Sequence, residues 1–367
     1  MKTPSGSNRK VDAGWDEATA TPPRRTDIRP LDGRDGHLRM ATHLFSSGRV
    51  REAIRHCQAA IDTDDRYAEA WLLLGRAQRQ TGELRLASAS LRRAAELMPR
   101  SAEVLHLLGV TCAALQEFDK ARWAFKAAVE LNADDGTARH LLDALSGRTT
   151  TGPPIEYVAG LFDRYAATFD SHMKGRLRYR LPDRLKKVLH PVVKRHGIFR
   201  HAVDLGCGTG LSGSALRHVA HRLTGVDISR GMIAVAAEKR MYDTLVHDEI
   251  TGFLRKTKDR FDLVIAADVF IYFGDLGTIF RLIRRRLSTG GLFLFTVEST
   301  SHQPFSLRRS GRYAHSGAYI RKLAAALGWA VSTDQSIAIR LEGLDWSRGR
   351  LFVLRNMGSP EGATPIR

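Results

Sequence analysis

Residues of similar size recur every 34 positions through the first 150 residues of this chain. Three such series run in step: Ala53, Ala87 and Ala121; Ala60, Ala94 and Ala128; and Cys57, Leu91 and Phe125. A fixed period of this length indicates a repeat architecture. Two antiparallel helices pack closely only where small residues let their backbones approach. Each period therefore predicts a helical pair that buries its apolar face only by stacking on its neighbours.

The middle period is the fullest, with Trp71, Leu74, Gly75, Ala87, Leu91, Ala94 and Pro99. This set resembles the tetratricopeptide repeat. Gly48 and Gly82 stand where the first helix of a pair turns into the second, and Gln116 provides a weaker turn in the third pair. We expect three repeats and a capping helix over residues 34–148. The concave surface of such an array binds a protein partner or serves self-association, and the sequence leaves both open.

The pattern changes after a Thr, Gly and Pro segment at 149–155, which predicts a linker. Short apolar runs then alternate with amphipathic stretches, which predicts βα units on a largely parallel sheet. The strands are expected at 201–205, 221–226, 243–246, 261–266, 292–297, 329–341 and 350–355. The predicted fold class is therefore a two-domain α plus α/β chain, in which a helical solenoid precedes a doubly wound sheet over residues 156–357. Residues 1–33 and 358–367 are expected to be disordered tails.

A glycine-rich turn follows the first expected strand, with Asp204, Gly206, Cys207, Gly208 and Gly210. Residues 208–213 also satisfy the dinucleotide fingerprint, so two cofactors compete for this turn. A dinucleotide would bring its pyrophosphate to the helix N-terminus, where the Asp204 carboxylate would repel it. S-adenosylmethionine brings a cationic ammonium group instead, for which a carboxylate is favourable. The turn therefore predicts S-adenosylmethionine, with a dinucleotide-dependent dehydrogenase as the outside alternative.

Further residues are placed to bind the cofactor at the ends of the next strands. Asp227 ends the second strand and can accept hydrogen bonds from ribose hydroxyls, with Ile228 beside it, and Met232 can pack on the adenine face. Asp248 follows the third strand and can accept from the adenine amino group, although a helix N-cap is the alternative. We interpret Cys207 as a small loop residue and not as a nucleophile.

These residues resemble the class I S-adenosylmethionine-dependent methyltransferases, and with the repeats the chain is similar to bacterial predicted methyltransferases that carry tetratricopeptide repeats. The resemblance spans about 34–357 and includes 157–182, 261–276, 312–320 and 351–355. It implies a Rossmann-like sheet with an antiparallel last strand, Asp268 in the cofactor site and a lid helix that holds Tyr165. A similar lid opens carrier-protein carboxyl methyltransferases, so the implied acceptor is a small molecule or a carrier-tethered acid.

Two residues are candidates for catalysis by direct in-line displacement. His315 is the hypothetical base, because the pKa of imidazole lies near neutrality; the alternative is a local hydrogen bond with Ser316. Tyr272 is expected to meet the acceptor, together with Asp268, Phe270, the lid residues Tyr165, Phe169 and His172, and the later residues Glu298, Tyr313 and Tyr319. Asp268 is not followed by Pro-Pro-Tyr, which lowers the expectation of exocyclic-amine methylation.

The net charge of +18 is concentrated after residue 150. Such a charge can steer an anionic partner, so RNA methylation is one alternative function, although no RNA-binding module is visible. An adaptor with a vestigial methyltransferase fold is another. The three cysteines are far apart and odd in number, so no disulfide framework and no metal site are expected. No apolar run approaches the roughly 20 residues of a membrane span. We therefore expect a cytoplasmic protein with no membrane partner.

Overall fold

The computed structural model describes residues 33–301, 303–342 and 345–358. Of the two expected tails, only Gly33 and Gly358 lie within the described residues. The chain divides into two compact units, residues 1–98 and 99–367. The expected linker at 149–155 therefore lies inside the second unit, and the expected domain boundaries stay predictions. Among the described residues, no helix is long and apolar enough to cross a membrane.

The first unit contains two antiparallel helical pairs, α1 (Arg34–Ser46) with α2 (Val50–Thr63), and α3 (Ala68–Thr81) with α4 (Leu84–Leu97). Gly48 and Gly82 adopt φ values of 79° and 85° where the first helix of each pair ends, a conformation that costs glycine little. A Cβ on Gly75 would lie 2.6 Å from Cγ of Leu91. The repeat therefore needs a glycine there, because the buried leucine of the facing helix fills that space.

The second unit begins with α5 (Ala102–Ala114), α6 (Phe118–Leu131) and α7 (Gly136–Leu145). A Cβ on Gly109 would lie 2.7 Å from the ring of Phe125, so the third pair packs as the second does. Gln116 takes φ 62° at the turn, the left-handed conformation of Gly48 and Gly82. The helices predicted from the 34-residue period, including the cap, are confirmed.

The first three residues of the segment at 149–155 are hydrogen-bonded to the rest of the second unit. The Thr149 hydroxyl accepts from the amide of Leu307, and the Thr150 hydroxyl bonds to that of Tyr313. The Thr151 carbonyl accepts from the amides of Gly274 and Asp275 at 3.1 and 3.0 Å. This segment is therefore a fixed strap on the second unit, not a free connection.

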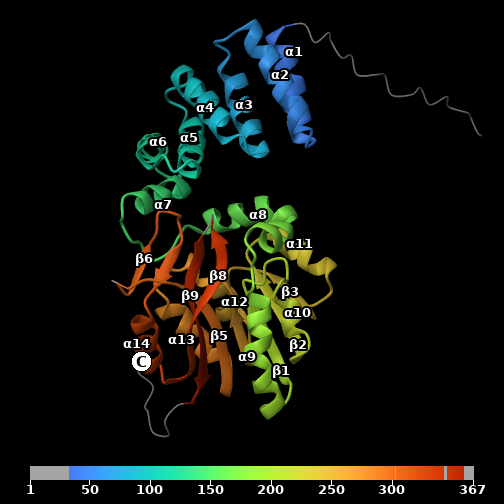
Figure 1. Ribbon diagram of the computed structural model, residues 1–367, viewed down its shortest axis with the longest axis vertical. Helices are drawn as coiled ribbons and strands as arrows, with labels where there is room; N and C mark the ends of the chain where they lie inside the picture. The colour runs from blue at the N-terminus through green and yellow to red at the C-terminus, as the bar shows by residue number, and fades with distance from the viewer. Residues whose placement is uncertain (1–32, 302, 343–344, 359–367) are drawn as a thin grey trace, which may run out of the picture. The chain divides into compact units, whose positions relative to one another are not determined.

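The second unit contains a mixed sheet in the order β3-β2-β1-β4-β5-β7-β6 (Figure 1). Five parallel strands form its centre: β1 (Phe199–Leu205), β2 (Ala220–Asp227), β3 (Thr244–His247), β4 (Phe261–Ala266) and β5 (Leu287–Ser299). The edge strand β6 (Phe305–Leu307) pairs antiparallel to β7 (Tyr313–His315), which pairs parallel to β5. The hairpin of β8 (Trp329–Glu342) and β9 (Asp345–Asn356) lies antiparallel against β5 through β9. The expected antiparallel last strand is confirmed.

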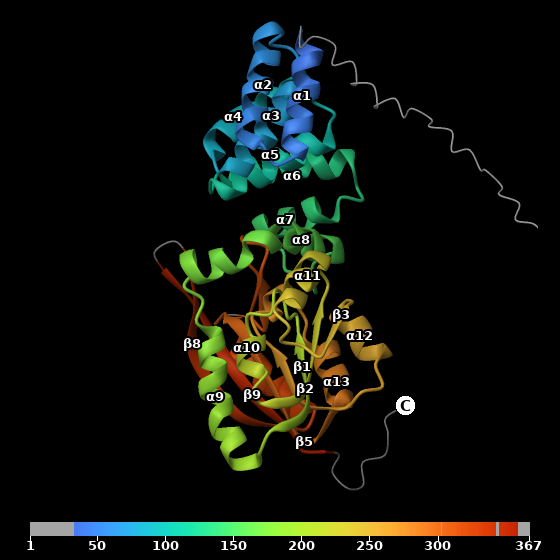
Figure 2. The same ribbon diagram turned by 90° about the vertical axis from the view of Figure 1, so that its right-hand side faces the viewer.

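Two hydrophobic cores cover the two faces of this sheet. One packs against α12 (Ile250–Lys256), α13 (Gly277–Arg286) and α14 (Gly317–Ala326), and the other against α9 (Leu181–His196) and the short α10 (Gly213–Leu216). Figure 2 shows α9 and α13 on opposite sides of the sheet. The sheet is thus sandwiched between helices, as the alternation of strand and helix patterns predicts.

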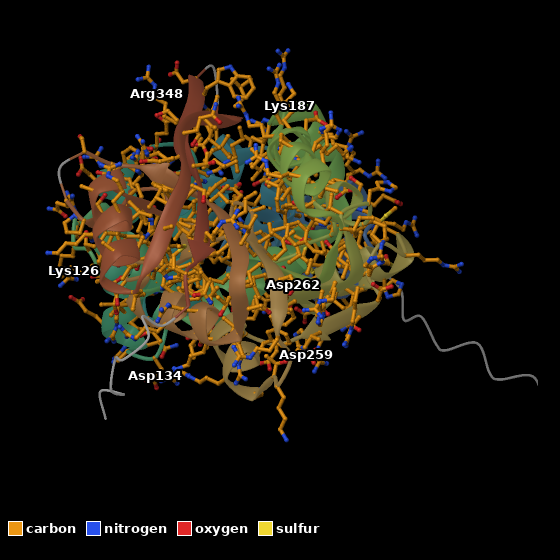
Figure 3. The ribbon with its side chains drawn as sticks, turned by 90° about the horizontal axis from the view of Figure 1, so that it is seen from below. Lys126, Asp134, Lys187, Asp259, Asp262 and Arg348 are labelled. Atoms are coloured by element: carbon orange, nitrogen blue, oxygen red, sulfur yellow. The ribbon has the colours of Figure 1, made fainter. Side chains whose placement is uncertain are left out.

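The two ends of the parallel strands differ in chemistry. At the amino end, the Asp262 carboxylate accepts from the amides of Arg200 and His201, and Figure 3 shows Asp259 and Asp262 on this side of the unit. The carboxyl end carries the glycine-rich turn, α11 (Arg230–Glu238) and the helix α8 (Ile155–Ser171), which contacts α11. Ligands of doubly wound sheets bind at the carboxyl end.

Candidate functional site

The turn after β1 needs its three glycines. Gly206, Gly208 and Gly210 all have positive φ values, of 70°, 54° and 83°. A Cβ on Gly206 would lie 2.5 Å from a methyl carbon of Val269, whereas a Cβ on Gly208 would enter open space. Gly206 therefore lets the loop pack on the segment after β4, and Gly208 leaves room for a ligand against the loop backbone.

Asp204 lies behind this loop and is almost fully buried. Its Oδ2 accepts a hydrogen bond of 2.8 Å from the Tyr242 hydroxyl, whereas its Oδ1 is buried without a partner among the described residues. The pKa of Asp204 is raised to about 7 in total. Burial is the main cause, the Tyr242 hydrogen bond opposes the rise in part, and the negative charge of Asp227 adds to it. A buried carboxylate oxygen with no donor is costly, so this position is suited to a cationic or hydrogen-bond-donating ligand group.

Asp227 ends β2 on the wall of the cavity. Its Oδ2 accepts from the amide of Gly208 at 2.8 Å and its Oδ1 from the amide of Ser229 at 2.9 Å. Burial raises the pKa of Asp227, and these two amide hydrogen bonds lower it in part. The carboxylate thus ties the glycine loop to the start of α11, and its remaining lone pairs are available to a ligand.

A cavity of about 750 Å³ lies at the carboxyl end of the strands. Its lining includes the glycine loop, the start of α11 and the segment after β4, and the lid helix α8 contributes aromatic side chains. The aromatic lining residues are Phe162, Tyr165, Phe169, Tyr179, Tyr272 and Phe273. Phe162 contacts both Phe169 and Tyr272 edge to face, at centroid distances of 6.3 and 5.3 Å. The cavity is therefore largely apolar, with polar groups at the loop and on the lid.

Two carboxylates of the lid helix α8 bind it to the glycine loop and to α11. Oδ1 of Asp163 accepts from the Ser229 hydroxyl at 2.6 Å and from the amide of Gly231 at 3.1 Å. These hydrogen bonds, that from Ser229 first, lower the pKa of Asp163. Asp170 accepts from the Thr209 hydroxyl of the glycine loop and from Lys239. The helix is thus bonded to both segments that line the cofactor side of the cavity.

An ion cluster around the buried Arg340 contributes Asp268, Arg340 and Glu342 to the cavity wall. The Arg340 guanidinium binds both oxygens of Asp268, at 2.8 and 2.7 Å, and also Glu298 and Glu342. Arg340 and Glu298 are 4% exposed. Although burial lowers it, the pKa of Arg340 is raised overall, because three carboxylates surround it. Asp268 itself takes φ 59°, so this residue turns the chain sharply at the end of β4.

The structure brings together most, but not all, of the residues that the sequence singled out. The predicted residues that line the cavity are Tyr165, Phe169, His172, Gly206, Cys207, Gly208, Asp227, Ile228, Met232, Asp268 and Tyr272. Asp204 and Gly210 are outside the lining. Asp248 is outside the lining, because its carboxylate accepts from Lys256 and the amide of Glu249, and the neighbouring Glu249 and Ile250 meet the cavity instead. Phe270, Glu298, Tyr313 and Tyr319 are also outside it.

His315 does not face the cavity. It is fully buried at the end of β7, where its Nε2 lies 2.8 Å from the carbonyl oxygen of Gly274. Burial lowers the pKa of His315 to about 4, although the hydrogen bond with Gly274 raises it in part. The alternative, a local hydrogen bond between His315 and Ser316, is not present either, because the Ser316 hydroxyl caps α14. We therefore propose a structural role for His315 in place of the hypothetical base.

Replacing His315 should affect stability and not chemistry. We expect His315→Ala to lower the free energy of unfolding by about 3 kcal/mol, through a cavity and an unpaired Gly274 carbonyl. Turnover per folded molecule should stay within about twofold. Urea unfolding together with an activity assay on the folded fraction checks this. A loss of about 100-fold in turnover with unchanged stability would return His315 to the role of base.

Several site residues gave little signal in the sequence. Arg340 follows Ile337 and Ile339 in β8, and alternation would place it on the opposite face from Ile339. A register shift between Ala338 and Leu341 buries both Ile339 and Arg340, as β-bulges do. Tyr242, the partner of Asp204, comes from the segment between α11 and β3. Asp163 and Asp170 did leave a signal, because a spacing of seven residues on a helix places two side chains on the same face.

Comparison with known proteins agrees with these observations. Residues 203–295 match the family described as a methyltransferase domain. Residues 44–94 and 102–135 each match a family described as a tetratricopeptide repeat. The match covers the glycine loop, Asp227 and Asp268, which favours the sulfonium cofactor over a dinucleotide.

Curated relatives share this domain. A ubiquinone biosynthesis O-methyltransferase of Methylobacterium sp. (strain 4-46) is 28% identical over 172 residues, which is 43% of this chain and 69% of the relative. The enzyme of the same description from Coxiella burnetii (strain Dugway 5J108-111) is 27% identical over 32% of this chain and 50% of its own length. A trans-aconitate 2-methyltransferase of Paracidovorax citrulli (strain AAC00-1) is 25% identical over 38% of this chain and 50% of its own length.

Solved structures were also compared with the chain. The N-methyltransferase NodS from Bradyrhizobium japonicum WM9, in complex with S-adenosyl-L-homocysteine, superposes with a TM-score of 0.44 at 22% identity. This superposition covers 54% of this chain and 98% of the other.

Proposed function

We propose that this chain, an S-adenosylmethionine-dependent methyltransferase with tetratricopeptide repeats, methylates a small-molecule or carrier-tethered acceptor that enters the apolar cavity under α8. The observation that carries this proposal is the glycine loop between two buried carboxylates. One of them, Asp204, has a free oxygen, and the other, Asp227, lies on the cavity wall.

The residues of the loop fit the cofactor. We assign the open Oδ1 of Asp204 to the ammonium group of the cofactor, directly or through a water that this group holds. We assign Asp227 to the ribose hydroxyls, and the open space at Gly208 to the approach of the ligand to the backbone. Met232, which is fully buried and lines the cavity, is suited to pack on the adenine. When bound, S-adenosylmethionine supplies an activated methyl group.

The remaining task of the protein is to position the acceptor and to exclude water. Positioning alone can contribute roughly 7–11 kcal/mol to lowering a barrier. The aromatic side chains of Phe162, Phe169 and Tyr272 line the cavity, and they suit an acceptor with an apolar body. The curated relatives named above are O-methyltransferases in two cases, which supports an oxygen atom as the methyl acceptor.

We propose that the repeats bind a protein partner or a second copy of the chain. Trp123 on α6 is 60% exposed, and it lines a surface hollow with Leu142 of α7. An exposed tryptophan of this kind is common at interaction sites. Cys57 and Cys207 are buried free thiols, which supports the expected cytoplasmic location.

The cofactor assignment is tested by adding one methyl group to the loop. Gly208→Ala should weaken S-adenosylhomocysteine binding by about 10- to 100-fold, because overpacking a ligand site costs about 1–3 kcal/mol. Gly290→Ala is the matched control, since Gly290 has φ 78° and open space around it but lies at the start of β5, away from the cavity. Both variants should lose a similar amount of stability from backbone strain, and Gly208→Ala alone should lose affinity in calorimetry. Equal affinities in the two variants would contradict the assignment.

A further inference from the structure

We propose that the acceptor is a hydroxyl compound, and that His172, held by Tyr165, is the base that takes its proton. This inference rests on the proposed function and names the substrate class of the same cavity. His172 and Tyr165 both line the cavity, and His172 Nδ1 is hydrogen-bonded to the Tyr165 hydroxyl. The two rings also meet edge to face, at a centroid distance of 5.3 Å.

The four carboxylates of the cavity wall are already engaged. Asp227 accepts from two amides, Asp268 is bound by Arg340, and Glu342 is bound by Arg340 and Arg312. Glu249 accepts from the amides of Thr251 and Gly252 at the start of α12. Among the described lining residues, His172 is therefore the one near-neutral group with a ring nitrogen, Nε2, to which no bond is assigned.

The backbone at His172 is also unusual. The helix α8 passes there into a π-helical segment, η1 (His172–Arg176). Single π turns are uncommon and are found frequently at functional sites. Because seven residues separate Tyr165 from His172, the two side chains lie two turns apart on one face of the lid, which is the spacing that lets them bond.

Burial and one nearby cation favour the neutral imidazole. Burial lowers the pKa of His172, and the Arg176 guanidinium on η1 lowers it further. The lid also carries Asp170, which is paired with Lys239 and Lys174, and β8 brings Arg340 and Glu342, which are bound to each other. At neutral pH the ring can therefore accept a proton, as a general base must.

The proton balance follows from the hydrogen bond to Tyr165. In the tautomer in which Nδ1–H donates to the Tyr165 oxygen, Nε2 holds a free lone pair. The O–H bond of the acceptor breaks, its electron pair stays on oxygen, and its proton joins Nε2 to give an imidazolium. Tyr165 stabilises that cation and fixes the ring, so Tyr165 is a positioning residue. The imidazolium returns the proton to solvent when the product leaves.

The test uses the full chain, three probe acceptors and a control histidine. The probes are catechol, the more acidic 4-nitrocatechol, and 3-phenylpropionate, a carboxylate that needs no base. We expect His172→Gln to lower kcat/KM for catechol by about 10²–10⁴-fold and for 4-nitrocatechol by far less, because that hydroxyl is largely ionised without help. His190→Gln, at an exposed position on α9, should change neither value. S-adenosylhomocysteine affinity should be unchanged in both variants.

A second readout needs no turnover. In a histidine NMR titration, the resonance that disappears in His172→Gln should titrate below the ordinary value of about 6.5, and Tyr165→Phe should shift it. Equal losses with catechol and 4-nitrocatechol, methylation of 3-phenylpropionate alone, or an imidazole still protonated at pH 7.5 would overturn the base. A chain that binds S-adenosylhomocysteine but methylates none of the probes also overturns the base. A chain that does not bind S-adenosylhomocysteine overturns the proposed function instead.

Discussion

Asp204→Asn should make the ligand-free protein more stable at pH 8 and at the same time weaken S-adenosylhomocysteine binding by about 30-fold or more. The amide keeps an oxygen for the Tyr242 hydroxyl but removes the buried charge that has no partner. Removing one member of a buried charge pair costs about 2–5 kcal/mol of binding energy. Relief of the unpaired charge should raise Tm by about 2–4 °C for each kcal/mol gained.

The pKa of Asp204 determines the direction in which stability and affinity change with pH. Burial is the main cause that holds the pKa of Asp204 at about 7 in the folded chain, above the ordinary aspartate value of 3.8. Between these two values the folded state keeps a proton that the unfolded state has lost, so stability falls as the pH rises through this window. A cationic ligand group prefers the ionised form, so the affinity should weaken by about tenfold per pH unit below pH 7.

Calorimetry and thermal melts from pH 5.5 to 8.5 measure both effects. Asp204→Asn should flatten both pH profiles. Asp259→Asn is the matched control, because Asp259 is 42% exposed and pairs with Arg222 near the amino end of β4. Unchanged affinity in Asp204→Asn would remove Asp204 from the cofactor site.

Arg340→Met should cost about 3–5 kcal/mol of stability, because it leaves the Asp268 carboxylate, whose side chain is 11% exposed, without its cation. Glu298 would still have Arg312, at 3.1 Å, so the main penalty falls on Asp268. For a unit of this size, Tm should fall by about 10 °C. The double variant Arg340→Met with Asp268→Asn should recover a large part of the loss, since it removes the uncompensated charge as well.

A more exposed ion pair between α14 and the same strand provides the comparison. Arg321 binds Asp334 of β8 while 52% exposed, and such pairs contribute about 0–1 kcal/mol. Urea unfolding of Arg340→Met, Arg321→Met and the double variant measures the difference. If Arg340→Met were no more destabilising than Arg321→Met, the cluster would not act as a buried one.

The sequence predicted those features that depend on period and on local backbone geometry. The 34-residue period predicted the helical pairs, because Gly75 and Gly109 must be small wherever Leu91 and Phe125 are large. The glycine loop and Asp227 were predicted because positive φ values and strand ends leave local signals. Most of the residues predicted near β1 and β2 therefore lie at the cavity.

Features that depend on distant segments were not predicted. His315 of β7 has the side-chain chemistry of a base, but the fold buries it against Gly274. The bulge that turns Arg340 inward, and the hydrogen bonds of the 149–155 strap to the residues around Leu307 and Gly274, have no signal within a short window of sequence. Both result from tertiary packing, which overrides local pattern.

The most direct test of the account is a calorimetric titration of the full chain with S-adenosylhomocysteine and, separately, with NADH. The account predicts saturable binding of one S-adenosylhomocysteine per chain, strengthened between pH 6 and pH 8, and no heat with NADH. Folded protein that gave no heat with S-adenosylhomocysteine, or that bound NADH in its place, would contradict the assignment of the glycine loop and its two carboxylates.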